Sequence, residues 1–508
     1  MSTERPRVVV IGAGLGGLAI AIRLQSRGYR VTLCERRDQP GGRAAVYRDQ
    51  GFVFDAGPTV VTAPWLIQEL WELAGRRADD AVRFVRLDPY YRIHAHDGRM
   101  FDYSGDHDKM AAEVARFAPG DVDGYRRFLG ESEKIFKKGF EELGDKPFST
   151  VGSMLKVAPA LIRLGSHRSV YRFVSGFVKD EALRQVLSFH PLLIGGNPFA
   201  ASSIYALIHF LEQKWGVHWG LGGTGAIVAA MAKLFGELGG ELRLSSTVEE
   251  ILVDKRRTTG VRLAGGATLP ASIVVSNGDA GWTYRHLIAP EHRRRWTDRK
   301  IDRTRFSMSL FVIYFGLRRK HPDVAHHSIL LGPRYRELLH DIFEKKVLAE
   351  DFSLYLHRPT ATDPSLAPEG CDTFYALSPV PHLGAGIDWT VERDRYRDRI
   401  LDHLEQHHLP GLRRDLVTSH TITPLTFRDD LLSLHGAAFS VEPVLTQSAW
   451  FRPHNKSEEV EGLYLVGAGT HPGAGMPGVL STARVVDRLI PRLPDDGGRD
   501  PIAGTHAA

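Results

Sequence analysis

The sequence lacks most of what a secreted, metal-clustered or membrane-spanning protein needs. It has only two cysteines in 508 residues, Cys34 and Cys371, which excludes a disulfide framework and gives no cysteine spacing typical of a metal site. No run of 18 or more uncharged apolar residues occurs, so no membrane-spanning helix is predicted. The apolar stretch near the N-terminus ends at Gly12, short of signal-peptide length. We therefore expect a cytoplasmic protein, and we predict no metal ion.

Strong charge of one sign is also absent. The net charge is +5, and the basic runs at 292–295 and 318–320 come without any motif that reads DNA or RNA, so they are typical of solvated surface and no nucleic-acid partner is predicted. With 43% hydrophobic and 25% charged residues, the composition is that of a globular protein long enough for more than one core.

The strongest positive signal is a complete nucleotide-binding βαβ unit at residues 8–35. A strand at 8–11 leads into a glycine turn, a helix ends at Gly28, and a second strand at 31–34 ends on Glu35. In the turn, one glycine allows the tight bend, one lets the backbone approach a pyrophosphate, and one lets helix and strand pack closely. The glycines assigned to the site are Gly12, Gly14, Gly16 and Gly17. Glu35 is placed to bind a ribose hydroxyl, and the phosphate would rest on the helix N-terminus.

The residues after Glu35 indicate which dinucleotide binds. Residues 41–43 read Gly-Gly-Arg, and Arg43 can reach back over the cofactor phosphates with a bidentate, permanently charged fork. This order resembles the FAD-dependent amine oxidase and carotenoid desaturase superfamily. The resemblance implies FAD, with further contacts from a small-residue loop and from the backbone of a later strand. These further positions are Arg36, Gly42, Gly57, Pro58, Thr59 and Val248.

A second flavin-binding element is predicted near the C-terminus. A strand at 463–466 runs into a glycine-dense loop, and a helix follows from about Val479 to residue 490. Backbone amides of the loop can reach the flavin, and the positive end of the helix would stabilise negative charge on reduced flavin. Many relatives have an acid directly after the first glycine; here Ala468 stands there, so backbone contacts are expected instead. The residues assigned to the cofactor are Gly467, Gly469, Met476, Gly478 and Val479.

One more glycine pattern, at 220–225, is interpreted as a structural turn. The stretch before it is a poor buried strand, and the strand after its helix ends in Ser245-Ser246 where a nucleotide site would have an acid. We therefore predict no NADPH site.

Three further segments, at 189–198, 439–455 and 469–473, resemble the bacterial phytoene desaturases of carotenoid biosynthesis. The resemblance covers roughly residues 8–490. It implies desaturation of the linear C40 hydrocarbon 15-cis-phytoene, most often in four steps through carotenoid intermediates to all-trans-lycopene, with FAD reoxidised by quinone or oxygen. The residues agree, because a site for a hydrocarbon should be a long apolar tunnel, and the chain offers no nucleophilic triad that favours other chemistry.

Three residues are candidates for the proton acceptor of that reaction. Desaturation takes a hydride to flavin N5 and a proton from the neighbouring carbon. His471, in the glycine loop, is the first candidate, followed by His190 and Glu442. Each stands beside a proline or glycine turn, so the alternative for each is a structural hydrogen-bonding role.

Because the substrate would reside in a bilayer, a membrane-binding segment is expected. Apolar residues recur at helical spacing in 154–162, at Met154, Leu155, Ala158, Leu161 and Ile162, with Lys156 and Arg163 on another face. This pattern is typical of an interfacial helix, and peripheral association with the inner face of the cell membrane is the expectation. The alternative is an ordinary helix whose apolar stripe faces its own core.

Together these features predict an α/β protein with two domains. The first is a discontinuous Rossmann-like FAD-binding domain at 1–75, 220–300 and 456–494. The second is a mixed α+β substrate-binding and membrane-associating domain at 76–219 and 301–455, and a disordered tail is expected at 495–508.

Three alternatives stay open. They are another carotenoid desaturase or isomerase, an amine oxidase, and a non-catalytic isoprenoid carrier similar to Rab GDP-dissociation inhibitors. The intact C-terminal loop and Arg43 disfavour the carrier, and residues 467–476 offer no aromatic cage for an amine.

Overall fold

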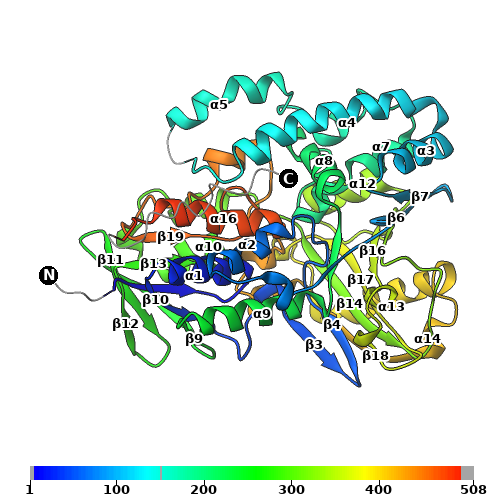
Figure 1. Cartoon of the computed structure of the whole chain (residues 1–508). Helices are drawn as coiled ribbons and strands as arrows, with labels where there is room; N and C mark the ends of the chain where they lie inside the picture. The colour runs from blue at the N-terminus through cyan, green and yellow to red at the C-terminus, as the bar shows by residue number, and fades with distance from the viewer. Residues whose placement is uncertain (1–4, 149–150, 494–508) are drawn as a thin grey trace.

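A parallel sheet forms the centre of the nucleotide-binding half of this computed structural model, which describes residues 5–148 and 151–493 (Figure 1). The predicted disordered tail lies outside the described residues. The sheet has the strand order β19-β13-β1-β2-β9, and every neighbouring pair is parallel. The strands are β1 (Arg7–Ile11), β2 (Arg30–Cys34), β9 (Glu241–Arg243), β13 (Ile273–Ser276) and β19 (Leu463–Leu465). Three distant parts of the sequence therefore meet in one sheet.

Both faces of this sheet are covered. On one face pack α1 (Leu15–Ser26), α2 (Trp65–Leu73), α9 (Gly223–Glu237) and α16 (Met476–Leu489). The other face meets a three-stranded antiparallel sheet formed by β10 (Val248–Asp254), β11 (Arg257–Leu263) and β12 (Thr268–Pro270). Burial on both sides explains why β1 is apolar at four successive positions, since a strand of a parallel sheet has no solvent face.

The second half is built on a larger, mostly antiparallel sheet of order β18-β14-β17-β16-β15-β6-β7. Its strands are β6 (Tyr91–His94), β7 (Met100–Tyr103), β14 (Ser309–Leu317), β15 (His327–Leu330), β16 (Leu354–His357), β17 (Asp372–Val380) and β18 (Leu416–Ile422). Along β14, Phe311, Ile313 and Phe315 face α13 (Trp389–His407), while Val312 and Tyr314 face the other way. This two-residue alternation places a distinct core on each face.

Helices cover the second of these faces (Figure 1). They are α3 (His107–Phe117), α4 (Val122–Phe136), α6 (Val170–Val174), α7 (Glu181–Ser188), α8 (Leu207–Trp215) and α12 (Tyr335–His340). Helix α5 (Val151–Arg163) lies apart from the large sheet, at the upper left of Figure 1. The remaining elements are β3 (Val46–Asp49), β4 (Phe52–Asp55), β5 (Phe84–Arg86), β8 (His218–Gly220), α10 (Ala280–Trp282), α11 (Asp298–Arg303), α14 (Leu412–Asp415) and α15 (Pro424–Asp429). Within residues 5–148 and 151–493, no helix has both the length and the apolar character to cross a bilayer.

The structure differs from the sequence-based expectation at one helix start. The C-terminal helix begins at Met476, three residues before the predicted start near Val479. A proline at the second helical position is compatible with this early start, because its missing N–H has no intrahelical partner there.

Candidate active site

One continuous cavity connects the two halves of the molecule. At one end it is lined by the turn after β1, by residues 35–37 and 41–44, by the loop 56–60, and by the C-terminal loop 467–479. At the other end it is lined by apolar side chains of the large sheet and the helical layer, among them Leu192, Leu211, Leu310, Val312, Leu377 and Phe439. The two glycine-rich elements predicted from the sequence therefore open onto one site.

The turn before α1 is shaped for close approach by a ligand. Gly12 has φ of +90°, and a Cβ at Gly17 would lie 2.0 Å from the Gly12 carbonyl oxygen. Gly14 and Gly16 line the cavity, and in the described part of the chain no side chain caps the helix that starts after Gly14. The first N–H groups of α1 therefore remain available for an anion such as a pyrophosphate.

Sequence reasoning missed Asn277, which follows β13 and lines the same part of the cavity. Its Nδ2 donates a hydrogen bond of 3.3 Å to the Gly12 carbonyl oxygen. Cβ atoms at Gly14 and Gly16 would come within 2.9 Å and 2.5 Å of its amide group. The strand order that places β13 beside β1 was the available signal, because Asn277 is the residue directly after that strand.

Glu35, the residue assigned to a ribose hydroxyl, opens onto the cavity. Its side chain is buried and lines the cavity at the end of β2. Oε2 accepts a hydrogen bond from the Ala13 amide at 2.8 Å, and Oε1 accepts one from the Arg37 amide at 3.0 Å. An ionised carboxylate has about four acceptor positions, so two remain for ribose hydroxyls. Val248, which the resemblance assigns to an adenine contact, also lines the cavity.

The predicted arginine also faces the cofactor end of the cavity. Arg43 Nη2 donates to Ser433 Oγ at 2.6 Å, while its buried Nε has no hydrogen-bond partner among the described residues. Burial lowers the pKa of Arg43 and the Asp279 carboxylate raises it. A buried guanidinium with an unused N–H beside an uncapped helix fits an anionic cofactor. Arg36 also lines the cavity, but its guanidinium donates to the Asp429 carbonyl oxygen at 2.7 Å.

The loop at 57–59 joins the cofactor end to the large sheet. A Cβ at Gly57 would lie 1.9 Å from the Arg43 carbonyl oxygen, so only glycine allows these two segments to touch. Pro58 lines the cavity, and Thr59 Oγ1 lies 2.9 Å from the hydroxyl oxygens of both Tyr355 and Tyr375.

The C-terminal loop supplies a second uncapped helix start. In the described residues, α16 has no side-chain hydrogen bond at its N-cap, and Gly467, Met476, Gly478 and Val479 line the cavity. Gly42 does so as well. Of the described residues assigned to the cofactor, only two do not line it: Gly17 and Gly469 pack behind the wall. A Cβ at Gly469 would meet the side chains of Ala280 and Ser440 at 2.8 and 2.9 Å, so this glycine serves packing.

The three proton-acceptor candidates occupy different positions. His471 lines the cavity, with Nε2 3.3 Å from the Leu143 carbonyl oxygen, and burial lowers its pKa to about 4. The ring is therefore neutral near pH 7, and a proton on Nε2 leaves the Nδ1 lone pair free. His190 lies behind the wall, with Nε2 3.2 Å from Oε2 of Glu212, and Glu212 itself lines the cavity.

The structure does not bring Glu442 to this site. Its buried carboxylate accepts a hydrogen bond of 2.8 Å from Arg305 Nε, and it is not among the described residues that line the cavity. Burial raises its pKa and Arg305 lowers it. This ion pair corresponds to the structural alternative considered for Glu442.

The glycine pattern at 220–225 forms a turn, as interpreted. The Asp55 carboxylate accepts hydrogen bonds from the Thr224 amide at 2.9 Å and the Gly225 amide at 3.0 Å. The N-terminus of α9 is thus occupied by a carboxylate of the chain itself, which leaves no room for a phosphate.

Helix α5 has features of both an interfacial helix and a helix whose apolar stripe faces the protein interior. Met154 and Leu161 line the cavity, whereas Leu155 and Ile162 are 67% and 66% exposed. Lys156 and Arg163 are exposed beside them. The apolar stripe is therefore divided between the cavity and solvent.

The chain is similar to known proteins over nearly its whole length. Residues 15–488 match a family model described as flavin containing amine oxidoreductase. The chain is 53% identical to a lycopene-forming phytoene desaturase of Pantoea ananas, over 95% of this chain and 98% of that protein. It is 51% identical to a neurosporene-forming phytoene desaturase of Rhodobacter capsulatus, over 96% of this chain and 94% of that protein.

Solved structures share the fold at low identity. A putrescine oxidase variant has a TM-score of 0.65 at 14% identity, covering 96% of this chain and 98% of its own. An oxidoreductase from Methanosarcina mazei has a TM-score of 0.64 at 17% identity, covering 95% of this chain and 100% of its own. These similarities confirm the predicted α/β fold with a Rossmann-like flavin-binding sheet.

Proposed function

Because this chain belongs to the flavin-containing amine oxidoreductase family and, within it, to the phytoene desaturases, we propose that it desaturates 15-cis-phytoene in four steps to all-trans-lycopene. It is an FAD-dependent oxidoreductase. Carotenoid intermediates are then its successive substrates, and quinone or oxygen is the electron acceptor.

The observation that carries the proposal is the composition of the cavity. Its cofactor end presents two uncapped helix starts, Glu35 and Arg43, whereas its far end is lined by apolar side chains of the large sheet. Apolar walls bind a hydrocarbon by removing its surface from water, at about 25 cal/mol per Å². A substrate without polar atoms needs no fixed hydrogen-bonding partner there.

Bound FAD supplies the hydride acceptor. The turn at 12–17 and Glu35 would hold its adenosine end, and Arg43 would balance phosphate charge. The N-terminus of α16 would favour negative charge at the other end of the cofactor. Sequence reasoning missed Arg452, whose buried Nη2 donates to the Val441 and Ala468 carbonyl oxygens, each at 2.9 Å. We propose that Arg452 holds the C-terminal loop in place.

We assign His471 as the proton acceptor. Its Nε2 contact with the Leu143 carbonyl oxygen fixes the ring, and Nδ1 can take the proton lost by the carbon next to the site of hydride removal. An allylic cation is a strong acid, so an imidazole of depressed pKa is basic enough to receive its proton.

We also propose that α5 places the cavity against a membrane. The helix carries cavity-lining and exposed apolar residues side by side, and basic residues flank them. A lipid-soluble substrate could then pass between bilayer and cavity without crossing water. This supports peripheral association with the inner face of the cell membrane.

The decisive experiment is reconstitution. Protein loaded with FAD is incubated with liposomes that contain phytoene, with and without a quinone, and the coloured products are separated. We expect lycopene as the end product. Accumulation of neurosporene would mean that the protein carries out fewer than four desaturation steps. Unchanged phytoene under every condition would refute the proposal.

The role of His471 is tested by His471→Gln, with His454→Gln as the matched control. His454 is also buried and lies 3.0 Å from a backbone carbonyl oxygen, but it is outside the described residues that line the cavity. We expect an unchanged flavin spectrum in both variants. Turnover should be at least about 100-fold lower in His471→Gln and unchanged in His454→Gln. Equal turnover of the two variants would remove His471 from the chemistry.

A further inference from the structure

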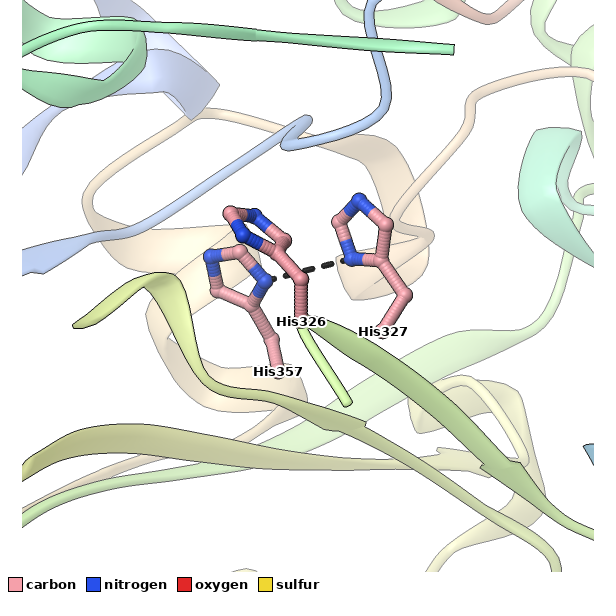
Figure 2. Close-up of side chains that lie close together, drawn as sticks. All are labelled: His326, His327 and His357. Carbon is pink, nitrogen blue, oxygen red and sulfur yellow. Dashed lines mark hydrogen bonds between the residues drawn. The ribbon is translucent and has the colours of Figure 1, made fainter. Parts of the chain in front are cut away.

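Three histidines gather on the large sheet, on the face that also carries the cavity-lining residues Ile329 and Tyr355. His327 opens β15 and His357 closes β16, and the two residues are paired directly across these antiparallel strands. His326 precedes β15 and brings a third ring next to them (Figure 2). Directly opposed residues of antiparallel strands point to the same face of a sheet, which explains why two rings meet from strands far apart in the sequence.

The rings are buried and close together. His326, His327 and His357 are 6%, 0% and 2% exposed. Their ring centroids lie 4.5 to 5.1 Å apart. One nitrogen of each ring lies within 4.8 Å of one nitrogen of each of the other two.

The Nδ1 atoms of all three rings have a hydrogen-bond partner, and the buried Nε2 atoms of all three have none among the described residues. Nδ1 of His327 and Nδ1 of His357 face each other at 3.2 Å (Figure 2). His326 Nδ1 lies 2.7 Å from Thr362 Oγ1, and its buried Nε2 has no hydrogen-bond partner in the described part of the chain. Two ligands of a tetrahedral ion with bonds of about 2.0–2.1 Å are about 3.3 Å apart. The spacing of the two facing nitrogens matches that value.

One basic and two acidic side chains lie near the cluster. The Arg358 guanidinium is close to His326, but it is paired with Asp372 at 3.0 Å, and Asp363 adds a nearby carboxylate.

The Tyr355 hydroxyl group lies between the cluster and the cavity. The Tyr355 hydroxyl oxygen lies 2.6 Å from His327 Nδ1 and 2.9 Å from Thr59 Oγ1. Through Thr59 the cluster is linked to the loop that lines the cofactor end of the cavity.

We propose that His326, His327 and His357 bind one transition-metal ion of the zinc type, through Nε2 of His326 and Nδ1 of the other two. Imidazole ligands favour zinc, copper or nickel, whereas calcium and magnesium require oxygen ligands. The ion joins β15 to β16 and braces the cavity wall, and it has no part in hydride transfer.

The adjacent pair His326-His327 lies 31 and 30 residues before His357, a separation that carries no local metal-binding signature. Only the pairing of β15 with β16 shows that they meet.

The test measures metal binding on the FAD-loaded protein. The protein is treated with a chelator, desalted and titrated with Zn²⁺ by calorimetry, and Co²⁺ is added separately for its visible absorption spectrum. We expect about one ion per chain, a tetrahedral Co²⁺ spectrum and a higher melting temperature with Zn²⁺. In His326→Gln and in His357→Gln, the affinity should fall by more than about 100-fold.

Two controls make the result specific. His321→Gln removes another buried histidine whose Nε2 has no partner among the described residues, and it should bind Zn²⁺ as the unmodified protein does. A double variant at His403 and His407, whose rings lie 4.8 Å apart on α13, removes a competing surface chelate. Zn²⁺ binding that is lost in this double variant and kept in His326→Gln and His357→Gln would overturn the proposal. So would the absence of stoichiometric Zn²⁺ and of a Co²⁺ spectrum, which would leave the cluster as hydrogen-bonded imidazoles.

Discussion

Replacing Glu35 by alanine tests the cofactor site at its most specific contact. The carboxylate holds two backbone amides, those of Ala13 and Arg37, and two acceptor positions remain on a side chain that lines the cavity. Glu35→Ala therefore removes two separate contributions. One supports the turn itself, and the other is the contact that we propose with the ribose of bound FAD.

The two contributions have different magnitudes. Hydrogen bonds to a charged group contribute about 1.5–3 kcal/mol, so loss of the ribose contacts should raise the Kd for FAD about 10- to 150-fold. The amides left by the carboxylate open onto a cavity that water can enter, so the free energy of unfolding of the FAD-free protein should fall by about 1–2 kcal/mol, the low end for an unpaired buried group. Glu35→Gln keeps one acceptor oxygen, so its Kd for FAD and its free energy of unfolding should lie between those of the unmodified protein and of Glu35→Ala.

Both quantities can be measured on the same preparation. FAD is removed, the FAD-free protein is titrated with FAD while flavin fluorescence is followed, and a parallel sample is unfolded in urea. Glu241→Ala is the matched control: this acid lies on the neighbouring strand β9, its side chain is 51% exposed, and its ion pair with Arg243 is a surface pair of small value. If Glu35→Ala bound FAD within about twofold of the control, where about tenfold or more is expected, the ribose assignment would be refuted.

Three further predictions follow from the same geometry. Gly17→Ala places a Cβ 2.0 Å from a carbonyl oxygen of the turn and should abolish FAD retention, which flavin absorbance measures. Gly236→Ala adds its Cβ to open space on α9 and should stabilise the folded protein by about 0.5–1 kcal/mol, which the melting temperature measures. Burial lowers the pKa of His471 from 6.5 to about 4 on folding, so protonation favours the unfolded chain. The free energy of unfolding, measured in urea, should therefore fall as the pH drops from 6.5 towards 4. His471→Gln should make this fall smaller. Leu155→Glu should weaken cosedimentation with liposomes, while Val391→Glu, at 68% exposure on α13, should not; equal sedimentation of the two would remove α5 from the membrane contact.

Much of the cofactor site could be predicted because its signals are local. The turn at 12–17, Glu35 and the loop at 467–479 each follow a strand within a few residues, and a glycine is recognisable by the backbone path that it permits. Asn277, Glu212 and Arg452 were missed because a single polar residue has no local signature. Their positions depend on which strands and helices become neighbours.

The sequence by itself determined the nucleotide-binding unit, the second flavin element and the family, because each depends on residue types at fixed spacing along the chain. Tertiary structure decided which residues face the ligand. It brought His471 to the cavity, held His190 behind the wall beside Glu212 and paired Glu442 with Arg305 elsewhere. It also divided the stripe of α5 between cavity and solvent and paired β15 with β16 so that three histidines meet. The physical reason is the same in each case: the environment of a side chain is set by packing between segments distant in sequence, and no local pattern records that packing.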